Sequence, residues 1–285
     1  MTYGLTFFLF ANPHKPETVA ASANLARLLL ERGTRVLVDT WLYDQVSLGE
    51  PCALTDLKPD TTAVLSLGGD GTLLRTIAHA AALGIPVLGI HMGRVGFLLE
   101  VNPNEIHQAV ERLLQGDYHL EERMMLSCSV NEGDEMLVMN DVALTRGQSP
   151  SSIEVKAYAD GEEIFVSRGD GLLVATPTGT TGYALSAGGP VVYPLMSCLV
   201  LVSICSHILT QRPIVMPEDK TILLSASADR GQPCQIIMDG QVVINRVGEV
   251  RVQIRKAAAK ARFIRFSEQH FLPRLRQKQA EWNVT

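Results

Sequence analysis

The residues Gly68-Gly69-Asp70-Gly71-Thr72 stand between two segments of different character, and they constrain the fold more than any other stretch of this chain. Residues 63–67 before them are an apolar run of strand length, and residues 72–83 after them read as a helix that closes at Gly84. A strand, a glycine-rich turn and a helix in this order place backbone N–H groups where a phosphate can sit. The glycines lack Cβ atoms at the point of closest approach. The stretch therefore predicts an α/β unit with a phosphate site at the turn.

One carboxylate, Asp70, stands among these glycines. An acid in a phosphate site would repel the phosphate unless it handles a proton or a metal ion. The bland alternative is structural, since Asp before a helix commonly serves as an N-cap. We expect the catalytic role for Asp70, because glycines flank it on both sides.

Length and charge limit the classes of protein that fit the chain. Its 285 residues suggest two domains, and 46% hydrophobic residues with 19% charged residues can support a sizeable core. The net charge is −5 and no long basic run is present, which argues against a nucleic-acid partner.

The cysteines and the apolar segments indicate the compartment. Five widely spaced cysteines form no Cys-x-x-Cys pair, which argues against a zinc site and suits a reducing cytosol. Residues 1–10 have no basic leader, so we expect a first strand rather than a signal peptide. Residues 191–210 are long and uncharged, but Pro194 interrupts them, and we expect a buried strand at Leu199–Ile204 rather than a membrane span. We predict a cytoplasmic location, no membrane partner and no metal ion held by side chains.

Strands and helices alternate through the first part of the chain. Strands are expected at Leu5–Phe10, Arg35–Asp39, Ala63–Leu67 and Ile85–Ile90. Helices are expected from Pro16 to Gly33, after the glycine turn, and from Asn102 to Gln115. This rhythm predicts an α/β domain over residues 1–120 with a doubly wound parallel sheet, in which ligands lie beyond the carboxyl ends of the strands.

Short strands dominate the chain after Glu121, so residues 121–265 are expected to form a predominantly β domain. The expected strands are Met125–Val130, Glu135–Met139, Ile153–Ala159, Glu163–Ser167, Leu172–Ala175, Thr221–Ala226, Gln235–Met238, Val242–Ile244 and Glu249–Ile254. Asp160-Gly161 and Asp239-Gly240 have the composition of hairpin turns. The polar, helix-prone tail, residues 266–285, is expected to dock back on the first domain.

Two further blocks are rich in groups that bind polar ligands. Arg168 to Pro190 is dense in glycines and hydroxyls and poor in charge, so it can present many N–H and O–H donors. Asn140-Asp141 follows an apolar run, and an adjacent amide and carboxylate suit ribose hydroxyls or an adenine edge.

Taken together, these blocks resemble the NAD kinase family. The matching stretches, in order, are Gly68–Thr72, His91-Met92-Gly93-Arg94-Val95-Gly96-Phe97-Leu98, Asn140-Asp141-Val142, Gly169–Pro190, His207 with Arg212–Val215, and Asp239-Gly240-Gln241. The first motif also occurs in lipid kinases and, in related form, in phosphofructokinases. The Gly169–Pro190 block is much more specific, and the resemblance covers nearly the whole chain.

The resemblance implies an enzyme that transfers the γ-phosphoryl group of ATP to the 2′-hydroxyl of the adenosine ribose of NAD, giving NADP. It implies a phosphofructokinase-like α/β N-terminal domain and a β-rich C-terminal domain, with NAD bound between them. Magnesium would be bound to the phosphates of ATP rather than to side chains. Members of the family usually form homodimers or homotetramers.

The resemblance also implies roles for single residues. Asp70 would take or orient the proton of the 2′-hydroxyl. The phosphates would be surrounded by Gly68, Gly69, Gly71 and Thr72, with Arg75 near them. NAD or ATP would further be bound by Asn140, Asp141, Arg168, Asp170, Thr181, Gly182, Tyr183, Ala184, Leu185, Ser186 and Gln241. Asp141 stands where many members of the family carry Glu, which keeps the charge and shortens the reach by one methylene.

Two rival functions and several details stay open at this point. A lipid or sphingoid kinase shares the glycine motif, but the chain lacks the basic amphipathic helix expected of an enzyme that works on a membrane. A non-catalytic NAD(P)-binding sensor would have no need of Asp70. The residues do not distinguish ATP from polyphosphate as the donor, NAD from NADH as the acceptor, or a dimer from a tetramer.

Overall fold

The computed structural model describes residues 4–93, 96–228, 233–267 and 271–282, so Arg94 and Val95 of the quoted motif and the end of the tail lie outside the described residues. The chain divides into two compact units. Unit 1 comprises Met1–Glu122 and Ala261–Thr285, and unit 2 comprises Arg123–Lys260. The second boundary therefore lies at residue 260, inside a long strand, rather than after residue 265.

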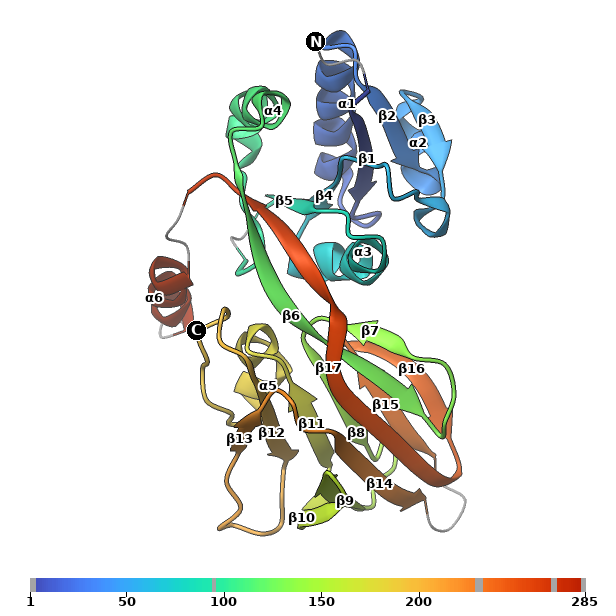
Figure 1. The fold of residues 1–285 in the computed structure, drawn as a ribbon, viewed down its shortest axis with the longest axis vertical. Coiled ribbons are helices and arrows are strands. Elements are labelled where there is room, and N and C mark those ends of the chain that lie inside the picture. Colours follow the sequence, from blue (N-terminus) through green and yellow to red (C-terminus); the bar gives the residue numbers. More distant parts are fainter. Residues whose placement is uncertain (1–3, 94–95, 229–232, 268–270, 283–285) are drawn as a thin grey trace. The chain divides into compact units, whose positions relative to one another are not determined.

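Unit 1 is built on a parallel sheet whose strands follow the order β5-β4-β1-β2-β3. The strands are β1 (Thr6–Ala11), β2 (Arg35–Asp39), β3 (Glu50–Cys52), β4 (Ala63–Gly68) and β5 (Val87–His91). The helices are α1 (Pro16–Glu31), α2 (Thr40–Val46), α3 (Asp70–Ala82), α4 (Ile106–Gln115) and α6 (Phe271–Trp282), with short 3₁₀ turns at Leu54–Asp56 and Pro103–Glu105. Figure 1 shows α1 running alongside β1.

Helices cover both faces of this sheet, because successive side chains of a strand point to opposite sides. Phe7 and Leu9 of β1 share one apolar cluster with Leu29 of α1. On the other face, the Arg75 guanidinium of α3 lies 5.4 Å from the centre of the Phe10 ring. The strands are buried along nearly their whole length, as a covered parallel sheet requires. The predicted doubly wound α/β fold is confirmed.

Unit 2 is predominantly β, as predicted, and contains two antiparallel sheets. The first contains β9 (Ile153–Ala159), β10 (Glu162–Gly169), β14 (Ile222–Ala228) and β17 (Gly248–Arg265), with β6 (His119–Val130) and β7 (Met136–Val138) pairing at its side. The second, in the order β13-β12-β11-β8-β15-β16, contains β8 (Asp141–Thr145), β11 (Gly171–Ala175), β12 (Cys198–Ile204), β13 (Ile214–Pro217), β15 (Cys234–Met238) and β16 (Gln241–Arg246). A single core cluster takes side chains from both sheets.

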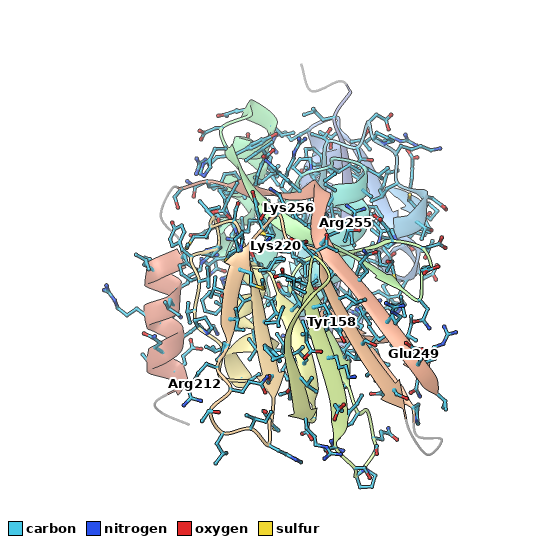
Figure 2. The ribbon with its side chains drawn as sticks, turned by 60° about the horizontal axis from the view of Figure 1, so that its bottom comes forward. Tyr158, Arg212, Lys220, Glu249, Arg255 and Lys256 are labelled. Carbon is cyan, nitrogen blue, oxygen red and sulfur yellow. The ribbon has the colours of Figure 1, made fainter. Side chains whose placement is uncertain are left out.

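Both predicted hairpin turns are confirmed, and one strand is longer than predicted. Asp160-Gly161 joins β9 to β10 and Asp239-Gly240 joins β15 to β16, and both residues of each turn have positive φ, as a two-residue hairpin turn needs. Strand β17 runs to Arg265, eleven residues beyond its expected end. Its exposed side chains alternate with buried ones, and Glu249 and Arg255 lie on its solvent face (Figure 2).

Among the described residues, no helix is long and apolar enough to cross a membrane. The suspected segment instead contains strand β12, whose residues are almost all buried in the second sheet of unit 2.

Candidate active site

The glycine turn joins β4 to α3 at the carboxyl end of the parallel strands of unit 1. A Cβ added to Gly68 would lie 2.4 Å from the Thr72 hydroxyl oxygen, so only glycine fits there. Thr72 is buried, and its hydroxyl accepts a hydrogen bond from the Gly69 N–H at 3.4 Å. A Cβ on Gly69 or Gly71 would meet no atom within 4 Å. The turn thus shows open space at Gly69 and Gly71, where an anion can reach the start of a 13-residue helix.

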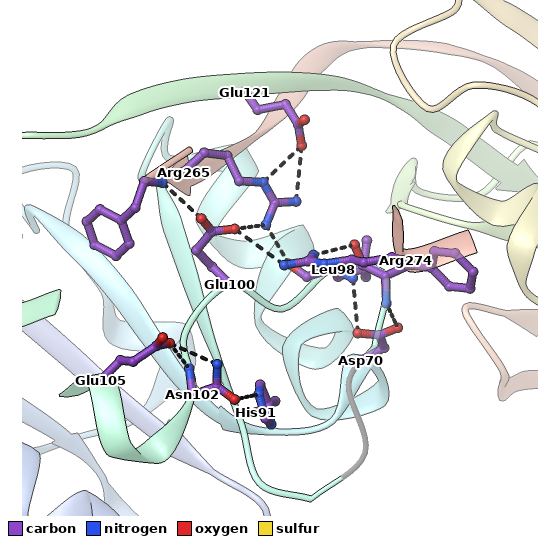
Figure 3. Close-up of polar contacts among 11 residues, drawn as sticks. Asp70, His91, Leu98, Glu100, Asn102, Glu105, Glu121, Arg265 and Arg274 are labelled. Atoms are coloured by element: carbon purple, nitrogen blue, oxygen red, sulfur yellow. Dashed lines mark hydrogen bonds and ion pairs between the residues drawn. The ribbon is translucent and has the colours of Figure 1, made fainter. Parts of the chain in front are cut away.

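Asp70 is the first residue of α3, and its carboxylate is held by a second segment of unit 1 (Figure 3). Its Oδ2 accepts a hydrogen bond from the Phe97 N–H at 2.8 Å, and its Oδ1 accepts one from the Leu98 N–H at 3.2 Å. A Cβ on Gly96 would lie 2.0 Å from Oδ1. The carboxylate is therefore fixed in direction and half-buried, and each oxygen retains acceptor capacity.

Two cationic side chains lie in the same region of unit 1. Arg75 is exposed on α3, beside the ring of Phe10. The Lys15 ammonium donates to the Met92 carbonyl at 2.9 Å, and the Met92 N–H donates to the Gly68 carbonyl at 2.9 Å. Arg75 was predicted from the sequence as a phosphate contact, whereas Lys15 was not. The signal for Lys15 was its position in the loop after β1, at the strand edge where doubly wound sheets bind ligands.

In unit 2, three strand ends bring the other predicted blocks together. Asp141 begins β8 and pairs in register with Ala175, the last residue of β11. The hydroxyl-rich block therefore starts beside Asp141. On the other side of β8, β15 ends at Met238, and the next carboxylate, Asp239, accepts hydrogen bonds from the N–H groups of Met139 at 2.9 Å and Asn140 at 2.6 Å.

The chain after β11 folds tightly over Asn140. The Thr176 N–H donates to the Asn140 carbonyl at 2.8 Å. A Cβ on Gly179 would lie 2.1 Å from that same carbonyl oxygen, so only glycine allows this approach. A Cβ on Gly182 would lie 3.6 Å from Asn140 Nδ2 and 3.8 Å from Asp141 Oδ2. The structure thus brings Gly182 close to the Asn140-Asp141 pair.

Three buried polar atoms in this region have no hydrogen-bond partner within the described part of the chain: Asn140 Oδ1, Asp141 Oδ1 and Thr178 Oγ1. Leaving such an atom unpaired costs about 1–3 kcal/mol. Burial, and secondly the charge of Asp239, raise the pKa of Asp141 to about 7. Burial also raises the pKa of Asp239, against its backbone hydrogen bonds. The region holds unused acceptors, which donors of a ligand such as ribose hydroxyls can satisfy.

The block Thr181–Ser186 is divided between core and surface. It comprises the end of a 3₁₀ turn (Thr178–Thr181), Gly182 and the short helix α5 (Tyr183–Ser186). The side chain of Ala184 is fully buried in an apolar cluster on the second sheet, so only its backbone can meet a ligand. Leu185 is half-buried, whereas Tyr183 and Ser186 are exposed. Thr181 donates its hydroxyl hydrogen to the Thr178 carbonyl at 3.0 Å.

Asp170 has a partner that the sequence analysis did not name. Its Oδ1 accepts a hydrogen bond from Arg146 Nε at 2.6 Å, and this bond is the main cause that lowers the pKa of Asp170. Arg168, expected beside Asp170, is exposed on β10 and lines a polar cavity of about 620 Å³ together with Arg146 and Lys156. Gln241 is exposed at the start of β16.

No group of three or more His, Cys, Asp or Glu side chains suited to a metal ion occurs within the described ranges.

Comparison with known proteins matches both parts of the chain to family models. Residues 7–118 match the model of the ATP-NAD kinase N-terminal domain, and residues 139–266 match that of the ATP-NAD kinase C-terminal domain. Similar curated proteins include the NAD kinase of Geotalea daltonii, 35% identical over 274 residues, covering 95% of this chain and 96% of that protein. The NAD kinase of Heliobacterium modesticaldum is 36% identical over 271 residues, covering 94% and 95%.

Solved structures share the fold. The crystal structure of yeast NADH kinase complexed with NADH aligns with a TM-score of 0.84 and 22% identity, covering 94% of this chain and 85% of that one. An NAD kinase from Archaeoglobus fulgidus in complex with ATP aligns with a TM-score of 0.72 and 25% identity, covering 94% and 96%.

Proposed function

This chain belongs to the ATP-NAD kinase family, and from that premise we propose how its own residues divide the work of the reaction. The chain is an NAD kinase, a phosphotransferase that converts NAD to NADP with ATP as the phosphoryl donor. The γ-phosphoryl group passes from ATP to the 2′-hydroxyl of the adenosine ribose. Such a transfer depends on positioning and charge neutralisation more than on covalent chemistry.

Asp70 is the group that takes or orients the proton of the 2′-hydroxyl. The observation that supports this role most directly is its carboxylate at the start of α3, fixed by the N–H groups of Phe97 and Leu98 and still half-accessible. A neutral ribose hydroxyl is a weak nucleophile, and a positioned base contributes about 10²–10⁴-fold to the rate. An N-cap role alone would not require a second segment of the chain to hold both oxygens.

The phosphates of ATP would be bound at the glycine turn. Open space at Gly69 and Gly71 admits phosphate oxygens to the N–H groups at the start of α3, where the helix dipole also favours negative charge. Lys15 and Arg75 supply positive charge at the same strand edge. Gly68 and Thr72 have a different role, because the Thr72 side chain occupies the space that a Cβ on Gly68 would need. They shape the turn.

NAD recognition is assigned to unit 2. The unpaired acceptors of Asn140, Asp141 and Thr178 would receive the hydroxyl or amino hydrogens of the dinucleotide. Thr181, Gly182, Tyr183, Leu185 and Ser186 would surround its adenine and ribose, with Ala184 contributing its backbone. Asp170, oriented by Arg146, would bind a further polar group, and Arg168 and Gln241 would make outer contacts.

Magnesium bound to ATP would neutralise phosphate charge when present. A homodimer or homotetramer is supported by exposed apolar side chains in unit 2, such as Leu195 at 51%, Met196 at 54% and Leu209 at 87% exposure. A cytoplasmic location is supported by the wide spacing of the five cysteines.

An assay of NADP formation tests the function and its recognition site together. With NAD, ATP and magnesium, we expect NADP to form, and we expect EDTA to stop the reaction. Asn140→Ala should raise the KM for NAD with a smaller change in the KM for ATP, because an acceptor for the dinucleotide is lost. Absence of NADP with either ATP or polyphosphate as donor would reject the function, and phosphorylation of a lipid acceptor instead would support the rival kinase.

A further inference from the structure

We propose that Arg274, on the tail helix α6, is a positioning residue for the carboxylate of Asp70. The proposal rests on the proposed function, because it explains how the acid assigned to proton handling is held. It concerns a residue 204 positions from Asp70 in the sequence, on helix α6.

A single peptide group connects the two side chains. The Arg274 guanidinium donates through Nη1 to the carbonyl oxygen of Phe97 at 3.1 Å. The N–H of that same peptide group belongs to Leu98, and it donates to Asp70 Oδ1 at 3.2 Å. A cation on the carbonyl polarises the peptide and strengthens the donor at its other end. Arg274 therefore acts on Asp70 through the Phe97–Leu98 peptide (Figure 3).

Two further contacts hold the segment Phe97-Leu98 in place. Arg265 donates through Nη1 to the Leu98 carbonyl at 3.0 Å, and the Phe271 ring of α6 lies 6.0 Å from the Phe97 ring. Both carbonyls of Phe97 and Leu98 are thus held by arginines, while both N–H groups hold Asp70. The segment has little freedom to turn its donors away from the acid.

Arg274 lies in a largely buried group of arginines and carboxylates. Arg265 already pairs with Glu121 at 3.0 Å and with Glu100 at 3.2 Å, and its side chain is 1% exposed. Arg274 lies 3.6 Å from Glu100 and is 13% exposed. Burial, and secondly the charge of Arg265, lower the pKa of Arg274, while Glu100 and Asp70 act in the opposite direction. The guanidinium remains charged at neutral pH.

The test compares Arg274→Met with the wild-type enzyme in two independent measurements. In the kinetic one, we expect kcat for NADP formation to fall about 10- to 100-fold, the effect of losing a hydrogen bond that involves a charged group. The KM values for NAD and ATP should change by less than about threefold, since Arg274 positions the acid and contacts no substrate. Arg274→Lys, which keeps the charge with a shorter reach, should recover part of the loss.

The second measurement does not depend on activity. Amide hydrogen exchange in the peptide covering residues 96–100 should become faster in Arg274→Met, because the Phe97 and Leu98 donors are released. Arg35→Met is the matched control: it removes an exposed arginine of the same unit that is bound to Glu50, and it should change neither kcat nor exchange at residues 96–100. If Arg274→Met does not fold, Arg274→Lys carries the exchange test alone.

The outcomes separate this inference from the proposed function. Normal exchange at residues 96–100 and an unchanged kcat in Arg274→Met would overturn the positioning role while the kinase activity stands. Faster exchange in a protein that makes no NADP would support the positioning role and reject the function. In the Asp70→Asn background, Arg274→Met should lower kcat little further, and a full additive loss would show that Arg274 acts elsewhere.

Discussion

Asp141, a proposed binding residue, carries an energetic penalty that arises from its burial. The residue is 3% exposed, and one of its carboxyl oxygens has no partner within the described residues. The pKa rises from 3.8 to about 7, chiefly through burial. The folded protein therefore holds a proton here that the unfolded chain releases near pH 4.

The first prediction follows from the sign of this shift. Between about pH 4 and pH 7 the unfolded chain has lost the Asp141 proton and the folded state retains it, so stability falls as the pH rises through this range. In Asp141→Asn this slope is absent. Relative to wild type, the variant should gain about 2–3 kcal/mol in free energy of unfolding between pH 5 and pH 8. Urea denaturation of both proteins at each pH measures it, and an equal difference at both pH values would contradict the assignment.

Substitution by alanine is expected to have different effects at two glycines near the proposed phosphate site. Gly96→Ala places a Cβ on the Asp70 carboxylate, so kcat should fall by about 100-fold, as a misplaced catalytic group does. Gly71→Ala meets only open space within helix α3, so it should stabilise the fold by up to about 1 kcal/mol. It should also raise the KM for ATP, since a methyl group then occupies the anion's approach. Steady-state kinetics with thermal unfolding checks both; a Gly71→Ala enzyme with unchanged KM would remove the phosphates from that position.

At the residue scale, candidate site residues that belong to a local motif could be named from the sequence. Residues whose contacts are with distant segments of the chain could not. Asp70, Asn140 and Asp141 stand next to strand ends that could be seen as apolar runs. Lys15 and Arg146 also follow strands, β1 and β8. Their contacts with Met92 and Asp170 could not be predicted from a local motif, because these contacts join segments that only the folded chain brings together. Ala184 was predicted as a binding residue because it lies in the block Thr181–Ser186. The direction of its side chain, which is buried, depends on the turn before it.

At the scale of elements, β17 is the clearest case in which tertiary contacts outweigh the intrinsic helix propensity of the residues. Residues 255–262 read Arg-Lys-Ala-Ala-Ala-Lys-Ala-Arg, a composition with high helix propensity, yet they continue a strand of 18 residues. Buried Ala261 and Phe263 alternate with exposed Lys260 and Arg262, which is a strand period. Pairing and burial in a sheet decide strand formation more than intrinsic preference does. Most predicted strands, by contrast, lie within two residues of the observed bounds, although β6 begins six residues before its expected start and β8 was not predicted.

This override gives a prediction at the same scale. Ala258 is exposed within β17, so Ala258→Thr should raise the free energy of unfolding by up to about 1 kcal/mol, since β-branched residues favour strands. A helix at this position would give the reverse sign. Chemical denaturation of the variant and of wild type measures this difference in free energy of unfolding. A loss of stability in the variant would contradict the assignment of residue 258 to a strand.

At the scale of the whole molecule, the chain is two cores joined by long strands. Both unit boundaries fall inside strands, β6 and β17. The fold class of each unit followed from the rhythm of apolar runs. The return of the chain to unit 1 at residue 261 could not, because no change in composition marks it. That return brings Arg265 and α6 to the segment that holds Asp70.

The central claim is that Asp70 handles the proton of the acceptor hydroxyl, and the turnover of Asp70→Asn in NADP formation tests it most directly. With NAD and magnesium-ATP saturating, kcat should fall about 10²–10⁴-fold while the KM for NAD stays within about threefold. Asp60→Asn, an exposed acid before β4 in the same unit, should match wild type. An Asp70→Asn enzyme that kept near-normal kcat would contradict the account.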